Sequence, residues 1–133
     1  MPVEQEIYTR LSAYTDLTDL VNTRIYPSQL PQNTTLPAIT YRRVSSSRFS
    51  AMGADSGVVK GRFQFDIWGN GVASYKSCVD IRTELQAALQ RWSTSGGSTD
   101  VFDIFLLNEI DLYETVTETT HLVIDYEINY KES

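Results

Sequence analysis

The chain is poor in the residues that build disulfides, metal sites and membrane spans. Its 133 residues include one cysteine, Cys78, so no disulfide can form within the chain. It has one histidine, His121, which leaves few of the ligands that a zinc site requires. No apolar run approaches the ~20 residues of a membrane helix, and residues 1–6 lack the basic and apolar regions of a signal peptide. We therefore expect neither a membrane span nor a signal peptide.

Basic residues are also scarce. Lys and Arg number 11 against 17 Asp and Glu, which gives a formal net charge of -6 at pH 7. A basic surface supplies most of the affinity of DNA-binding proteins, so this balance disfavours general binding to the outside of DNA. It is compatible with a protein past which DNA slides without sticking. One local basic region is best interpreted as a docking surface for an acidic neighbour, with nucleic-acid contact as the alternative: Arg42, Arg43, Arg48, Lys60 and Arg62.

Length and composition predict a single domain over residues 1–133. This is a common domain size, and a hydrophobic content of 41% is ordinary for a globular protein. Apolar residues at helical spacing predict a helix from Val3 and a short helix from Thr15 or Asp16. A long amphipathic helix is predicted from Val72 to Trp92, with this buried side: Tyr75, Val79, Ile81, Leu85, Leu89 and Trp92.

Alternating apolar residues predict four strands. They cover residues 39–44, 58–68, 102–112 and 122–130. Paired strands with only two substantial helices favour the α+β class: a mostly antiparallel sheet of about four strands, with two main helices on one face. Strict alternation places one set of the third strand's residues toward the helices: Phe102, Ile104, Leu106, Ile110 and Leu112.

Residues 45–57 interrupt this pattern. The segment is rich in Ser, Gly and Ala, and only Phe49 and Met52 are large apolar residues. Such a composition buries too little apolar area to order itself, so we interpret the segment as a long mobile hairpin loop. We expect it to become ordered on a partner through Arg48, Phe49 and Met52.

No residue pattern identifies a catalytic, cofactor-binding or metal site. Glu118 and His121 could pair on a metal, but zinc needs three or four ligands, and an exposed strand position is the better interpretation of His121. Cys78 fits a small buried residue better than a nucleophile, because no orienting group is identified for a Cys-His dyad. The paired carboxylates of the last two strands fit a solvated face better than an acid-base pair.

The face of the sheet opposite the helices carries apolar residues among its charges. They lie on neighbouring predicted strands and are candidates for an interface, unless sheet twist or a loop covers them: Trp68, Phe105, Leu107 and Val123.

Five short phrases occur in a fixed order along the chain. Each combines a turn or strand signature with proline or aromatic residues: Arg24–Pro27, Leu36–Tyr41, Phe63–Trp68, Leu112–Glu114 and Leu122–Ile128. Their order and spacing resemble the tail completion, or tail terminator, family of long-tailed bacteriophages, over nearly the whole chain. Asn22 and Ser28 stand where the family often has glycine, and both residues are compatible with a turn.

The resemblance implies a structural role and no enzymatic reaction. Proteins of this family act as rings, typically of six copies, that cap the tail tube, stop its polymerisation and offer the surface to which the DNA-filled head attaches. The implied partners are further copies of the chain, the tail tube protein and a head or neck connector protein. The implied location is the head-proximal end of the virion tail, with assembly in the host cytoplasm.

The resemblance also suggests a role for the acidic residues of the last two strands. An acidic ring lumen would let DNA pass without holding it, and the candidate lining is Asp103, Glu109, Asp111, Asp125 and Glu127. The alternative is that these residues lie on the outer wall of the ring. A neck or head-completion protein is the second functional hypothesis, and a small ligand-binding or enzymatic domain is a third.

Overall fold

The computed structural model describes residues 3–32, 34–51, 54–71, 74–90, 92–93 and 99–132. The side chains of residues 49–51, 54–56, 99 and 132 fall outside this description. The elements, in chain order, are α1 (Val3–Ala13), α2 (Thr15–Val21), β1 (Ile25–Pro27), β2 (Ala38–Ala51), β3 (Ala54–Asn70), α3 (Tyr75–Leu89), β4 (Thr99–Glu114) and β5 (Thr119–Glu132). No described helix has the length and apolar content needed to cross a membrane.

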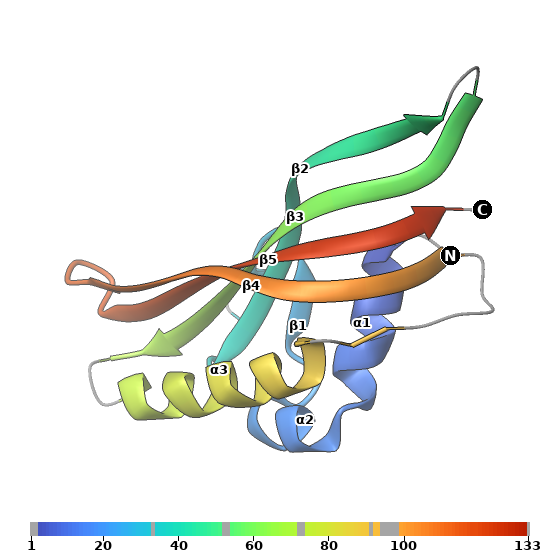
Figure 1. Cartoon of the computed structure of the whole chain (residues 1–133). Coiled ribbons are helices and arrows are strands. Elements are labelled where there is room, and N and C mark those ends of the chain that lie inside the picture. The colour runs from blue at the N-terminus through green and yellow to red at the C-terminus, as the bar shows by residue number, and fades with distance from the viewer. Residues whose placement is uncertain are drawn as a thin grey trace.

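The strands form one sheet in the order β1-β2-β3-β5-β4. Only the short β1 pairs in parallel, and every other neighbouring pair is antiparallel. The three helices lie on one side of this sheet, and the two long hairpins extend past them toward opposite ends of the molecule (Figure 1). The expected α+β class, with a mostly antiparallel sheet and helices on one face, is confirmed.

The core lies between the helices and the sheet. Alternate residues of β3 and β5 point toward the helices, and among them Phe63, Phe65 and Tyr126 are fully buried. The rings of Phe65 and Tyr126 meet edge to face at 5.5 Å, a favourable arrangement for an aromatic pair. From α3, the buried side consists of Cys78, Ile81, Leu85, Ala88 and Leu89. The predicted long helix is therefore present, although Tyr75, predicted to be buried, is 45% exposed.

The sheet differs from the predicted sheet in two places. Ile25–Pro27 forms a fifth strand, which is too short to show an alternation of its own. Residues 45–51 and 54–57, predicted to be loop, belong to β2 and β3. The loop prediction was wrong because it was based only on the small apolar content of the side chains. An antiparallel ladder is held by backbone hydrogen bonds, which serine and glycine supply as well as valine does.

Candidate functional site

None of the described helices packs on one face of the sheet (Figure 1). Residues of β3 and β5 that point away from the helices form this surface, which we call the outer face. Its members on these two strands are Lys60, Arg62, Gln64, Asp66, Trp68, His121, Val123, Asp125, Glu127 and Asn129.

Strand β4 changes its orientation on this face in mid-strand. Its register with β5 shifts between Leu106 and Asn108, which leaves Leu107 as a β-bulge. One extra residue reverses which side chains face the helices in the rest of the strand. Ile110 and Leu112 therefore lie on the outer face, where they are 44% and 51% exposed. The prediction that both face the helices was wrong, because strict alternation cannot anticipate a bulge.

The same bulge moves two acidic residues to the helix side. Glu109 and Asp111 pair with the buried Ile124 and Leu122 of β5, so their predicted place on the outward face was also wrong. Of the five candidate lumen residues, Asp103, Asp125 and Glu127 remain on the outer face.

Glu109 and Asp111 meet α3 through an ionic cluster. Arg82 donates a hydrogen bond to Asp111 at 2.6 Å and lies 4.0 Å from Glu109, and the Tyr75 hydroxyl donates to Asp111 at 2.5 Å. The hydrogen bond from Tyr75 is the largest cause that lowers the pKa of Asp111 below its ordinary value, and the hydrogen bond from Arg82 lowers it further. Partial burial of the carboxylate acts in the opposite direction. The hydrogen bond to Asp111 also raises the pKa of Tyr75. The cluster ties the β4–β5 hairpin to the helical layer.

The outer face of this hairpin is largely apolar. Leu107, Ile110 and Leu112 are exposed, while Phe105 and Val123 are partly buried. Val123 pairs with Ile110 and lies near Leu112, whereas Phe105 and Leu107 lie on the other side of the Asn108–Asp125 pair. The outward position of Ile110 and Leu112 could not be predicted from the sequence, since Glu109-Ile110-Asp111-Leu112 alternates equally well on either face.

Trp68, the fourth apolar candidate, already makes contacts with other residues of the chain. Its ring stacks on His121 with centroids 3.8 Å apart, and its indole N–H donates to the hydroxyl of the buried Thr40. His121 also lies 3.6 Å from Asp66. The expected strand position of His121 is confirmed, but its side chain is only 21% exposed because Trp68 covers it.

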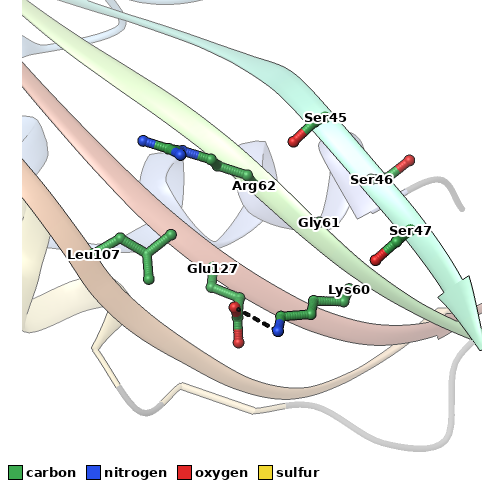
Figure 2. A pocket seen from close by; sticks show the side chains of 8 residues that line it. All are labelled: Ser45, Ser46, Ser47, Lys60, Gly61, Arg62, Leu107 and Glu127. Atoms are coloured by element: carbon green, nitrogen blue, oxygen red, sulfur yellow. Dashed lines mark ion pairs between the residues drawn. The ribbon is translucent and has the colours of Figure 1, made fainter.

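Toward the other end, the outer face is polar, and two ion pairs join β3 to β5 across it. Arg62 donates to Asp125 at 2.6 Å, and Lys60 lies 3.4 Å from Glu127. Lys60, Arg62 and Glu127 line a hollow of about 280 Å³ together with Leu107 and serines of β2 (Figure 2). Figure 2 shows Lys60 reaching across from β3 to Glu127 on β5. Within these two pairs the positive charges of β3 are balanced by the carboxylates of β5.

The tip of the β2–β3 hairpin holds the remaining candidate residues. Arg48 is exposed on β2. Met52 lies outside the described residues, and so does the side chain of Phe49. Where the hairpin leaves the helices, Arg43 donates to Glu4 of α1 at 2.7 Å, and its guanidinium lies over the ring of Phe63 at 5.5 Å.

The described residues contain no group of three or more His, Cys, Asp or Glu that could hold a metal ion. Cys78 is buried in the core, as predicted, and burial raises the pKa of its thiol. Glu118 lies in the β4–β5 turn with a positive φ of 52°.

Comparison with known proteins agrees with this picture. The family model described as "Tail completion protein gp17" matches residues 5–131. A chain in the structure "Virion of native gene transfer agent (GTA) particle" has a similar fold, with a TM-score of 0.80 at 12% sequence identity. The alignment covers 94% of this chain and 91% of that one. A second solved chain, without a functional description, has a TM-score of 0.51 at 16% sequence identity. That alignment covers 93% of this chain and 94% of the other. No curated protein matches by sequence.

Proposed function

The chain belongs to the family of tail completion protein gp17, and from this we propose that it completes the tail as a ring of six copies on the head-proximal end of the tail tube. It is a structural protein of the tail. In the proposal the ring stops further polymerisation of the tube and presents the surface to which the filled head attaches. The action is steric and needs no chemical reaction.

The observation that carries this proposal is the pair of hairpins at opposite ends of the sheet (Figure 1). A protein between tube and head must contact a different partner at each end. The β4–β5 hairpin offers exposed apolar residues, Ile110 and Leu112, whereas the β2–β3 hairpin offers serines and Arg48. Clustered exposed apolar residues mark interaction surfaces. Contact with the tube or the neck connector is therefore assigned to Phe105, Leu107, Val123, Ile110 and Leu112, with Trp68 at the margin.

The polar half of the outer face suits the wall of a DNA passage. Arg62 and Lys60 are each paired with a carboxylate of β5, so the surface offers DNA no excess of cations to bind. We assign Asp103, Asp125 and Glu127 to this wall. Replacing Glu127 with lysine should slow DNA ejection in a salt-dependent way while tails are still completed. An unchanged rate of DNA ejection would show that Glu127 does not line the lumen.

The deciding experiment removes the gene from the phage that encodes the chain. We expect electron micrographs to show tails of abnormal length and heads without tails, and a plasmid copy should restore normal particles. The alternative function, a neck or head-completion protein, predicts tails of normal length beside heads that have lost their DNA. Normal infectious particles without the gene would contradict both functions.

A further inference from the structure

Two hollows lie on the helix side of the sheet, at its opposite edges. The strand order places β1 at one edge and β4 at the other. A groove of about 540 Å³ lies between α1 and β1, and its apolar lining comes from Tyr8, Ile25, Tyr26, Pro27 and Tyr41. A smaller hollow of about 240 Å³ lies where β4 passes the start of α3, and it is lined by Tyr75, Asp111, Leu112, Tyr113 and Thr120. We call them the β1 groove and the β4 hollow.

One rung of the sheet joins the β1 groove to the β4 hollow. Successive partners across β1, β2, β3, β5 and β4 are Ile25, Ile39, Ile67, Leu122 and Asp111. The first of these residues lines the groove, and the last lines the hollow. Two copies set side by side along this rung therefore bring the β1 groove of one copy to the β4 hollow of the other.

Each of the two edges also presents exposed tyrosine rings. Tyr8 of α1 is 39% exposed beside the groove, and Tyr75 and Tyr113 are 45% and 40% exposed beside the hollow. Tyrosine is enriched at protein interfaces, because its ring is apolar while its hydroxyl can remain hydrated. The groove has room for such rings, since its volume lies within the ~300–1,000 Å³ of sites that enclose drug-sized ligands. Each edge thus combines a projecting ring with a recess.

Strand β1 offers a neighbouring strand no backbone N–H. Arg24 and Ser28 are bonded to β2 through their backbone groups. Alternation along the strand therefore directs Ile25 and Pro27 away from β2. The N–H of Ile25 already donates to Thr23, and proline has none. A contact at this edge is consequently made by side chains.

Charges of opposite sign adjoin the two recesses. Arg24 and Arg42 each stand next in sequence to a residue that lines the groove. Glu114 follows Tyr113 of the hollow. None of these three charges forms an ion pair with a residue that the structure describes, whereas Glu4 within the groove is already paired. Unlike edges therefore attract each other, and two β1 edges would bring like charges together.

We propose that Tyr75 and Tyr113 of one copy pack into the β1 groove of the next copy, whose Tyr8 packs against the β4 hollow of the first. This rests on the proposed ring and names its contact. Because the two surfaces differ, the contact is heterologous, so it repeats from copy to copy and produces a ring when the rotation closes. It lies on the helix side of the sheet and leaves the outer face of the β4–β5 hairpin to the tube or the connector.

Cross-linking in assembled tails tests this contact directly. Cys78, the only cysteine of the chain, is buried, so a short bismaleimide linker would react with added cysteines. Gln5 is exposed in the groove lining, and Thr115 is exposed two residues after Tyr113, so replacing both keeps the three tyrosines. Tails of Gln5→Cys/Thr115→Cys should give a ladder of linked chains up to the full ring.

The matched control moves one cysteine away from the groove. Asp16 is exposed on α2 and is not among the residues that line the groove. Asp16→Cys/Thr115→Cys should complete tails and give no ladder. Each single cysteine variant should also remain unlinked.

Removing the rings tests what they contribute. Tyr8→Ala and Tyr113→Ala truncate exposed side chains, so each variant should keep the wild-type melting temperature. Each should lower the number of completed tails at least about tenfold, because a buried interface tyrosine is commonly worth about 2 kcal/mol or more of binding. Leu20→Ala is the matched control, since Leu20 is 37% exposed on α2, and it should complete tails normally.

The outcomes separate this inference from the proposed function. If completed tails of Gln5→Cys/Thr115→Cys give no ladder, or linked pairs alone, the contact is wrong and the proposed function stands. Normal completion by both alanine variants would likewise overturn the contact. If tails are normal without the gene, the proposed function fails and the contact fails with it.

Discussion

The two long hairpins are built on the same sheet but held by different interactions. The β2–β3 hairpin is rich in serine, and a single arginine, Arg43, bridges Glu4 of α1 and the rings beneath it. The β4–β5 hairpin is held by Arg82 of α3 through Glu109 and Asp111, and it turns Ile110 and Leu112 outward. A backbone ladder alone can thus extend a hairpin, whereas the side chains decide what its surface can bind.

The largest expected effect comes from crowding the β2–β3 hairpin. A Cβ added to Gly61 would lie 2.8 Å from Cε1 of Phe63 and 3.4 Å from Cε1 of Tyr130. Gly61→Val should therefore lower the free energy of unfolding by about 1–3 kcal/mol in urea titrations. Ser46→Val, on the same rung of the neighbouring strand, is the control and should change it by less than about 0.5 kcal/mol. Equal stability of both variants would show that the ring of Phe63 has room to move.

The next effect concerns the attachment of the β4–β5 hairpin. Arg82→Ala leaves Glu109 and Asp111 without their cation, and we expect a loss of about 1 kcal/mol, since the cluster is partly exposed to solvent. Amide exchange in residues 108–119 should speed up, while exchange in the β2–β3 hairpin stays unchanged. Lys76→Ala, on the same helix but exposed, is the control. Uniform acceleration over both hairpins would mean that Arg82 stabilises the whole fold.

Acid should weaken the same hairpin selectively. The pKa of Asp111 is lowered in the folded chain, chiefly by the hydrogen bond from Tyr75. Its stabilising contribution is therefore present above the unfolded pKa, near 3.8, and is lost as the pH falls through the folded pKa. The wild type should exceed Asp111→Asn in stability by about 0.5 kcal/mol at pH 6, and by less at pH 3. A difference that does not change with pH would mean that the charge of Asp111 contributes nothing.

The smallest effect on stability is expected on the outer face. Leu112 is 51% exposed, so Leu112→Ser should change the free energy of unfolding by no more than about 0.5 kcal/mol. Leu122→Ser, one strand away and fully buried, should cost at least about 2 kcal/mol. Thermal melts of the two variants compare the two faces directly. A large loss in Leu112→Ser would place this residue in the core of the single copy.

Much of the fold could be predicted from local patterns. The spacing of Val3, Ile7 and Leu11 is typical of a helix that buries one stripe, and all three are buried. The alternation around Phe63 and Phe65 predicted the correct buried face of β3. The order of short phrases predicted the family. Each of these signals lies within a few residues of sequence, or in their order, and needs no knowledge of a distant partner.

Other features of the fold depend on how the strands pair with one another. Whether Leu107 forms a bulge depends on the register that β5 imposes, so the sequence could not say which of Ile110 and Asp111 faces outward. The extent of β2 likewise depends on the backbone of β3, which pairs with it whatever its side chains are. Local composition therefore determined the helices, the buried stripes and the class of sheet. Tertiary pairing decided the orientation of the surface residues, because register is a property of two strands and is not encoded in either strand alone.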